Sequence, residues 1–276
     1  MRGAAWRGRH GPTVLLYHRI ADLDSDPLGL AVSPAHFAEH LDVLRDRGVI
    51  GLAEAAAGAP GIAVTFDDGY ADNLVLRDAG IPVTLFVTTG AVEGGHGFWW
   101  DAIDRVCRER AGERIHVEDR AFVLGPVARA HLHQWLQPRD PRDIDAVLQA
   151  LGALDGDRPL TLDELRELAG HVEIGAHTRT HRSLRHATTA EQRAEIERSR
   201  DDLAQWLGRA PAAFSYPFGV PGDAFDATAK RLVREAGFTC AVANAPESSA
   251  DRFAIPRHTA PDVDGEGFAR WLDALG

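Results

Sequence analysis

The sequence predicts an α/β protein built on a parallel sheet or barrel. Short apolar runs of strand length alternate along the chain with stretches that carry apolar residues at helical spacing, which is typical of βαβ units. Hydrophobic residues make up 45% and charged residues 26% of the 276 residues, which fits a globular protein with one large domain or two small ones. The alternation therefore indicates the fold class, and the composition indicates a substantial core.

The expected strands are apolar runs bounded by glycine, proline or polar residues. If they pair in parallel, their carboxyl ends meet at one edge of the sheet, where ligands collect in α/β folds. In chain order they are Thr13–Tyr17, Ile62–Phe66, Val83–Val87, Val172–Ala176, Ala213–Tyr216 and Thr239–Ala243.

The helices between these strands have recognisable ends. They begin with N-cap residues, followed by proline or by capping-box spacing, and they end before glycine. On these signals we expect helices from Ser33-Pro34 to Gly48, from Thr161 (with Glu164) to Gly170, from Thr189 (with Gln192) to Gly208, and over Asp226–Ala236.

One interval departs from this rhythm. The stretch between Val87 and Val172 is far longer than a single crossover helix requires. Three segments in it, GFWWDAIDRVCRER, DPRDIDAVLQALGAL and TLDELRELAG, have the pattern of amphipathic helices. Because no linker, repeat or low-complexity tract is present, we expect one domain over residues 1–276 with a helical insertion at about 94–170 on one end of its core.

Charge and apolar length exclude several classes of function. The chain has 30 basic and 41 acidic side chains, a net charge of −11, so a nucleic-acid partner is not expected. No stretch approaches the roughly 20 apolar residues of a membrane span. The early apolar run Val14 to Tyr17 is much shorter than a signal-peptide core, so the sequence favours a cytoplasmic location.

The two cysteines do not indicate a metal site or a disulfide framework. Cys107 and Cys240 lie far apart and belong to no metal-type spacing. We expect both to be buried, reduced thiols.

The stretch AVTFDDGY, at residues 63–70, places Asp67 and Asp68 side by side at the end of an expected buried strand. Adjacent carboxylates repel each other and disfavour each other's ionised form. A bound metal ion would relieve this repulsion. The pair therefore indicates a metal site.

The stretch VEIGAHTRTHRSL places His177 and His181 four residues apart beyond another expected strand. If the chain turns helical from Thr178, both imidazoles lie on one face and can bind one ion. A chance pair of surface or core histidines is the alternative, since the chain has 13 histidines. The position after a strand favours the site, in which one carboxylate and two imidazoles would leave a place for water and the second carboxylate could take the water's proton.

These motifs resemble those of the polysaccharide deacetylases with a NodB homology domain, carbohydrate esterase family 4. TFDDGY looks like the family's first motif and HTRTH like its second, and the resemblance covers most of the chain outside the insertion. It implies a distorted (β/α) barrel with fewer than eight strands that removes acetyl groups from the nitrogen of 2-acetamido sugars. It also implies that Asp67 is the catalytic base, and that Asp68, His177 and His181 bind the metal, usually zinc and in some members cobalt or nickel.

The stretch FSYPFG, at residues 214–219, resembles the third motif of the same family. Pro217 and Gly219 are expected to shape a turn there. Tyr216, Pro217 and Phe218 are candidate residues for contact with the oxyanion or the substrate. The resemblance implies that the backbone N–H of Phe218 helps to stabilise the oxyanion of the tetrahedral intermediate. An ordinary turn is the alternative.

The chain departs from the family at Ser215, where many members carry an arginine that orients the base. Arg257 in FAIPRHTAP is the expected substitute, because it follows an extended apolar run near the end of the barrel. Sequences of the exopolysaccharide-associated branch, which begin with a YH strand, look similar in two respects. They have Tyr-Pro-aromatic-Gly in the third motif and Pro-Arg near the C-terminus. A surface Arg257 paired with Asp262 or Asp264 is the alternative.

Three further residues are candidates for contact with substrate. His258 is a candidate general acid that protonates the leaving amine. The alternative is that it lies on the surface or supports a catalytic residue without contacting substrate. His18 ends the first strand and either lines the groove or packs structurally. Trp100 either stacks on a sugar ring or belongs to the core.

The favoured interpretation is a metal-dependent hydrolase that removes N-acetyl groups from a 2-acetamido sugar in a polysaccharide, oligosaccharide or glycoconjugate precursor. Its partner is then an N-acetylated saccharide, and the sequence does not indicate an oligomeric state. Alternatives are a deacylase of another amide or ester, and a silent sugar-binding member, which Ser215 would suit. Intact Asp67, Asp68, His177 and His181 argue against silence.

Overall fold

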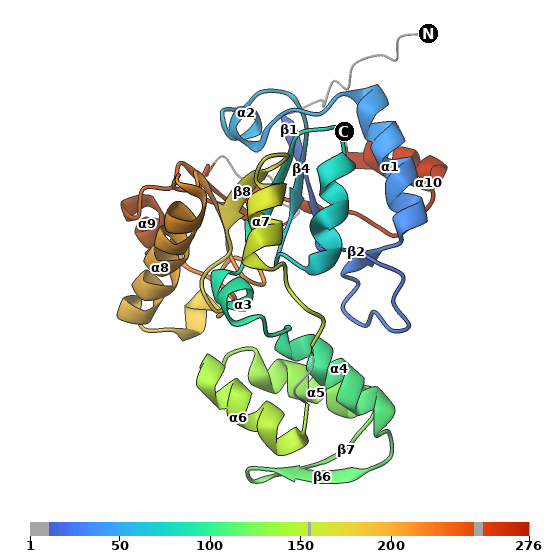
Figure 1. Cartoon of the computed structure of the whole chain (residues 1–276), viewed down its shortest axis with the longest axis vertical. Helices are drawn as coiled ribbons and strands as arrows, with labels where there is room; N and C mark the ends of the chain where they lie inside the picture. Colours follow the sequence, from blue (N-terminus) through green and yellow to red (C-terminus); the bar gives the residue numbers. More distant parts are fainter. Residues whose placement is uncertain (1–10, 154–155, 246–250, 276) are drawn as a thin grey trace.

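A sheet of eight parallel strands, in the order β11-β10-β9-β8-β5-β4-β1-β12, forms the centre of the fold (Figure 1). This computed structural model describes residues 11–153, 156–245 and 251–275. Every strand expected from the sequence is present, with bounds that differ by one residue at most. The strands are β1 (Pro12–Tyr17), β4 (Gly61–Phe66), β5 (Val83–Val87), β8 (Glu173–Ala176), β9 (Ala213–Ser215), β10 (Cys240–Ala243), β11 (Ile255–Pro256) and β12 (His258–Thr259).

One extended segment closes this sheet into a barrel. β11 and β12 are separated only by Arg257, yet they form the two opposite edges of the sheet. Ile255 pairs with Val242 of β10, whereas His258 pairs with Leu15 of β1. A single stretch of chain thus bridges both edges, so the barrel closes with fewer separate strand segments than the eight of a full (β/α) barrel.

Two layers of apolar side chains surround the sheet. Val14 and Phe86 fill the barrel interior, and α2 (Leu52–Ala56) adds Leu52 and Ala55 near the amino ends of the strands. A larger core lies between the outer face of the sheet and the helices around it. These helices are α1 (Pro34–Arg47), α7 (Leu162–Leu168), α8 (Thr189–Leu207), α9 (Ala227–Glu235) and α10 (Gly265–Leu275), with the 3-10 helices η1 (Ala71–Asp78) and η2 (Leu184–His186).

Most helix ends follow their expected caps. The side chain of Ser33 accepts a hydrogen bond from a backbone N–H in the first turn of α1, and Thr161 forms a capping box with Glu164 at the start of α7. The side chain of Asp226 accepts backbone hydrogen bonds in the first turn of α9, without a capping box. Such bonds satisfy backbone N–H groups that have no partner within the helix.

The cap expected for α8 is wrong by one residue. Thr188 and Glu191 form the capping box, in place of Thr189 and Gln192. Both pairs have the right spacing, but a carboxylate interacts better than an amide with the positive end of the helix dipole. Gln192 is instead buried, and its amide donates a hydrogen bond to the carbonyl of Ala187.

The insertion contains more than the expected helices. Its apolar side chains form a cluster of their own, apart from the barrel core. A β-hairpin and α5 were not expected, and α7 packs with the barrel core through Leu165 and Leu168 instead of with the insertion. The elements in this stretch are α3 (Thr89–Gly94), α4 (Trp99–Glu109), β6 (Arg114–Val117), β7 (Arg120–Val123), α5 (Pro126–Leu136) and α6 (Pro141–Leu151).

The two chain segments that connect the insertion to the barrel cross at a pair of glycines. A Cβ atom on Gly97 would overlap the backbone of Gly156, so only glycine fits at this crossing. Near it, Arg19 of the short strand β2 (Arg19–Ile20), which pairs with β3 (Ala31–Val32), donates a 2.6 Å hydrogen bond to Asp157. These contacts place the insertion at the end of the barrel opposite α2 (Figure 1).

Two simpler expectations concern the membrane and the cysteines. Within the described residues, no helix has both the length and the apolar character needed to cross a membrane. Cys107 and Cys240 are both buried and free, as the sequence predicted.

Candidate active site

Polar residues collect at the carboxyl ends of the barrel strands. Asp67 and Asp68 follow β4, His177 follows β8, and Asn244 follows β10. Arg257 joins them from the closing segment. Parallel strands end at one edge, so residues far apart in the sequence meet there without any local signal.

Asp68, His177 and His181 form a group that could hold a metal ion. One potential ligand atom from each lies within 4.8 Å of the others, and all three side chains are buried. Nε2 of His177 lies 3.4 Å from Oδ1 of Asp68, and Nε2 of His181 lies 3.2 Å from the same oxygen. Two imidazoles and one carboxylate are the donor set of many catalytic zinc sites.

The hydrogen bonds of the group support a cation between these atoms. Nδ1 of His177 lies 2.9 Å from the carbonyl oxygen of Ser215, and because a carbonyl only accepts, Nδ1 carries the hydrogen. In the neutral ring, Nε2 then presents a lone pair toward Asp68. Oδ1 of Asp68 is buried and makes no hydrogen bond with the described residues. The residues therefore fit a divalent ion, which would satisfy lone pairs that otherwise face each other.

Electrostatics keep the Asp68 carboxyl ionised. Burial by itself would raise its pKa, but without a metal, protonated imidazoles of His177 and His181 outweigh burial and hold the pKa of Asp68 well below its usual range. A metal ligand must be deprotonated, so the carboxylate is in the state that binding requires.

The histidine pair converges through an irregular loop, not through the helix that the spacing suggested. The residues from His177 to Ser183 are not helical, and Thr178 and His181 have positive φ values of 60° and 56°. Asp68 is a third residue in this conformation, with φ of 76°. Positive φ values are unfavourable for residues other than glycine, and residues that adopt them cluster at functional sites.

Two neighbouring elements hold this loop in place. The carboxylate of Glu195 in α8 accepts backbone hydrogen bonds from Arg179, at 3.0 Å, and from Thr180, at 2.8 Å. Gly90, at the start of α3, donates a 2.7 Å backbone hydrogen bond to the carbonyl of Arg179. The imidazoles of His177 and His181 are thus positioned by contacts across the fold.

Asp67 is held by Arg257 through a bidentate contact. Nη1 of Arg257 lies 2.8 Å from Oδ1 and Nη2 lies 2.6 Å from Oδ2, and Ser215 Oγ donates to Oδ2 at 3.0 Å. Burial raises the pKa of Asp67, but the charges of Arg257 and His177 outweigh burial and leave that pKa below its usual value. The contact between Arg257 and Asp67 that the sequence predicted is therefore present. Asp262, an alternative partner for Arg257, pairs with His36 instead.

Sequence reasoning missed Asn244. Its Oδ1 accepts a 2.7 Å hydrogen bond from Nη2 of Arg257, and its backbone N–H donates to the carbonyl of Gly219 at 2.8 Å. Its side-chain amide also lies 3.3 Å from the carbonyl of Phe218. Asn244 thus joins the Arg257 guanidinium to the third motif. The available signal was its position, one residue beyond an expected strand, like that of Asp67.

A cavity of about 350 Å³ lies over these residues. Asp67, Asp68, both histidines of the metal group, Asn244, His18, Phe218 and Trp100 line it. Burial lowers the pKa of His18, although the charges of Asp68 and Asp67 oppose this effect.

Trp100 contributes to both the core and the cavity. Its side chain is buried, and its Nε1 donates a 2.7 Å hydrogen bond to the hydroxyl of Tyr70. Its ring lies 4.6 Å from that of His181, measured between centroids. Trp100 therefore packs beside a candidate ligand and presents only a small part of its surface to the cavity.

Three expected site residues are not among those that line this cavity. Tyr216 and Pro217 are buried, and the hydroxyl of Tyr216 donates a hydrogen bond to the carbonyl of Phe253. His258 follows Arg257 directly, and consecutive residues of an extended chain face opposite sides. Because Arg257 faces the barrel interior, His258 faces outward.

The insertion and a loop also contribute to the cavity. His133 and Gln137 come from α5 and its C-cap, and Leu28 to Leu30 come from the loop between β2 and β3. No pattern in the sequence predicted these contacts. They depend on how the insertion packs over the barrel.

Comparisons with known proteins agree with this geometry. A family described as "Polysaccharide deacetylase" matches residues 55–241. Among solved structures, a Streptococcus pyogenes deacetylase, PplD, in complex with acetate, is similar with 17% identity and a TM-score of 0.65, over 96% of this chain and 98% of that chain. No curated protein sequence matches this chain.

Two further solved structures are similar in fold. IcaB from Ammonifex degensii has 21% identity and a TM-score of 0.57, over 95% of this chain and 97% of that chain. The BpsB deacetylase domain from Bordetella bronchiseptica has 16% identity and a TM-score of 0.56, over 93% and 98%. At these identities the likeness shows the fold.

Proposed function

The chain belongs to the polysaccharide deacetylase family and has the fold of sugar deacetylases, and from this premise we propose a metal-dependent N-deacetylase. It would remove N-acetyl groups from a 2-acetamido sugar in a polysaccharide, oligosaccharide or glycoconjugate precursor. The observation that supports this proposal is the Asp68, His177 and His181 group beside an ionised Asp67, all on one cavity.

Asp68, His177 and His181 would hold the metal, for which zinc is the first candidate, with cobalt or nickel as alternatives. When bound, such an ion lowers the pKa of a water molecule and polarises an acyl oxygen. Asp67 acts as the general base that takes a proton from water as it attacks the acetamido carbonyl. Arg257 keeps Asp67 ionised and in a fixed orientation.

The developing oxyanion and the leaving amine need partners of their own. Phe218 lines the cavity and has a positive φ of 61°, and its backbone N–H is the proposed oxyanion donor. His18 is the proposed donor of a proton to the leaving amine, because it lines the cavity and interacts with the charges of both aspartates. His133 also lines the cavity, but no such interaction with a carboxylate accompanies it.

Release of acetate tests the proposal. Purified protein, loaded with zinc, cobalt or nickel in turn, is incubated with a panel of N-acetylated saccharides, and acetate is measured. We expect release that a chelator stops and added metal restores. Absence of acetate with every metal and every saccharide would contradict the proposal, and release from O-acetyl esters alone would favour a different deacylase.

His181→Ala should lose the metal. Purified protein is expected to hold about one ion per chain, and removal of one of three protein ligands weakens binding greatly. Elemental analysis after dialysis measures this. The matched control is His133→Ala, which removes another imidazole of the same cavity and should leave metal content unchanged. Unchanged metal in His181→Ala would refute the assigned ligand set.

His18→Gln and His258→Gln separate the two candidate proton donors. His18→Gln should lower turnover by roughly 10²-fold, the lower range for loss of a general acid, while metal content stays. His258→Gln should retain parental turnover, because its side chain faces away from the cavity. Steady-state rates of acetate release measure both, and the opposite ranking would return the role to His258.

A further inference from the structure

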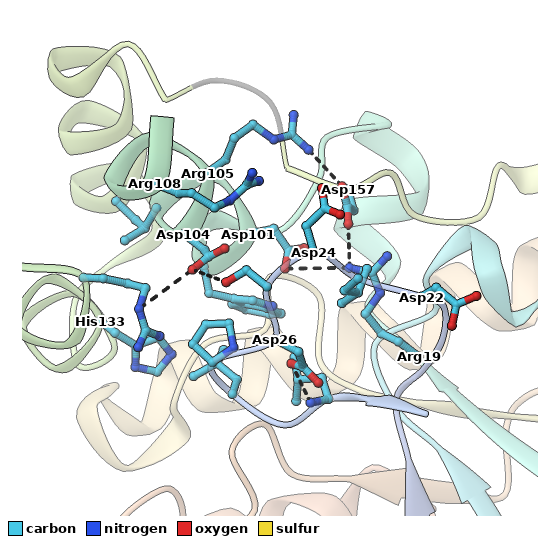
Figure 2. Close-up of a pocket in the computed structure, with 18 residues that line it drawn as sticks. Arg19, Asp22, Asp24, Asp26, Asp101, Asp104, Arg105, Arg108, His133 and Asp157 are labelled. Carbon is cyan, nitrogen blue, oxygen red and sulfur yellow. Dashed lines mark hydrogen bonds and ion pairs between the residues drawn. The ribbon is translucent and has the colours of Figure 1, made fainter. Parts of the chain in front are cut away.

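A second cavity of about 270 Å³ lies beside the catalytic one (Figure 2). One wall is the loop of residues 21–30, between β2 and β3, and the other is formed by α4 and α5 of the insertion. The two cavities share Leu28, Leu30, Trp100 and His133 in their linings. The two cavities therefore adjoin along these four side chains.

Contacts between the two walls hold the second cavity in shape. Asp157 accepts hydrogen bonds from Arg19, at 2.6 Å, and from Arg105 of α4, at 2.9 Å. Ser25 of the loop donates a 3.3 Å hydrogen bond to Asp104 of α4. In Figure 2, dashed lines join Asp157 to Arg19 and to Arg105. A cavity braced before the ligand arrives loses less entropy when the ligand binds.

The charges in the cavity disfavour an anionic ligand. Six aspartates and four arginines line it. Arg19 and Arg105 are already paired with Asp157, and Arg129 lies 3.8 Å from Asp104. A pyrophosphate, as in a nucleotide-linked or lipid-linked sugar, is bound by unpaired arginines or lysines or by helix N-termini. Here it would meet more carboxylates than free guanidiniums.

Three charged side chains that line the cavity make no side-chain hydrogen bond or ion pair with the described residues: Asp22, Asp24 and Arg108. Asp24 and Arg108 come from opposite walls of the cavity, the loop and α4. One offers acceptors and the other offers donors. Sugar hydroxyl groups donate to carboxylates and accept from guanidiniums, so this pair suits an uncharged polyhydroxyl ligand.

We propose that this second cavity is a subsite for an uncharged sugar residue linked to the residue that is deacetylated, recognised through Asp24 and Arg108. The proposal rests on the proposed function and deepens it. The preferred substrate is then an oligosaccharide or polysaccharide, and a single sugar on a nucleotide or lipid pyrophosphate is disfavoured. The insertion acts as the element that selects for a neighbouring sugar residue.

Kinetics with substrates of increasing length test the subsite. We measure acetate release from N-acetylglucosamine, from its linked di-, tri- and tetrasaccharides in several linkages, and from the uridine-diphosphate-linked monosaccharide. The parent protein should show a kcat/KM that rises from the monosaccharide to an oligosaccharide. Equal efficiency on the monosaccharide, or a preference for the nucleotide-linked sugar, would overturn the proposal.

Variants locate the effect. Arg108→Ala and Asp24→Ala should each lower kcat/KM for the oligosaccharide by about tenfold, mainly through KM, which is the loss expected for a hydrogen bond to a charged group. Activity on the monosaccharide should not change. The matched control is Arg114→Ala, another arginine of the insertion that does not line the cavity. Equal losses on both substrates, or none on either, would overturn the proposal.

A binding measurement separates this proposal from the proposed function. Oligosaccharide binding is titrated by calorimetry with metal-loaded Asp67→Asn protein, with and without Arg108→Ala. A weaker affinity caused by Arg108→Ala supports the subsite even if no acetate is released by the parent. If acetate is released but neither binding nor kinetics responds to Arg108→Ala and Asp24→Ala, the subsite is refuted and the deacetylase function remains.

Discussion

Asp67→Asn is expected to lower turnover by roughly 10² to 10⁴-fold, the range typical for removal of a general base, while metal content stays at the parental level. The amide is nearly the same size as the carboxylate but cannot accept a proton. Asp68→Asn is expected to lose both metal and activity, because Oδ1 of Asp68 lies beside Nε2 of both His177 and His181. Elemental analysis and acetate release on the two variants separate the roles.

The neighbouring guanidinium makes a stability control necessary. Asp67→Asn removes the charge that faces the buried Arg257, and loss of one partner of a buried ion pair destabilises a protein by about 3–5 kcal/mol. Thermal unfolding must therefore show that the variant is folded at the assay temperature. If Asp67→Asn loses its metal and Asp68→Asn keeps it, the two roles are reversed.

Arg257→Lys is expected to lower turnover by about 10 to 100-fold, the range for residues that orient groups in a metal site, with metal content unchanged. The planar guanidinium contacts both oxygens of Asp67 and also Asn244. A lysine ammonium keeps the charge but cannot reproduce the two parallel hydrogen bonds. Asp67 would then remain ionised but lose its fixed orientation.

Two further variants sharpen this test. Arg270→Lys is the matched control, because Arg270 is exposed on α10, and it should keep parental turnover. Ser215→Arg should not improve the parent enzyme, since Ser215 Oγ already lies 3.0 Å from both Asp67 and Arg257, and a second guanidinium there would be repelled. Parental turnover in Arg257→Lys would show that the contact with Asp67 is only structural.

Asn244 connects this test to the third motif. It accepts from Arg257 and bonds to the backbone of Gly219, so it couples the base to the loop that presents the proposed oxyanion donor. Residues of this kind are difficult to recognise from sequence. An asparagine after a strand is also common in turns, and only the contact with Arg257 distinguishes it.

The sequence by itself determined six strands of the barrel sheet, most helix ends and the pairs Asp67-Asp68 and His177-His181. These features depend on neighbouring residues: an apolar run predicts a strand, and polar residues directly after it lie at the strand end wherever that strand packs. The two motifs also carried the resemblance to the family, and the match over residues 55–241 agrees with it.

Tertiary structure decided whatever depends on contacts between distant segments. Arg257 reaches Asp67 across 190 positions of sequence because one extended segment closes the barrel, and the register of that segment turns His258 outward. His181 is positioned by a loop that α8 and α3 hold, not by a helix. The second cavity exists only because the insertion packs against the loop of residues 21–30. Local periodicity encodes elements, whereas register and packing are set by interactions between elements, which a single sequence does not reveal.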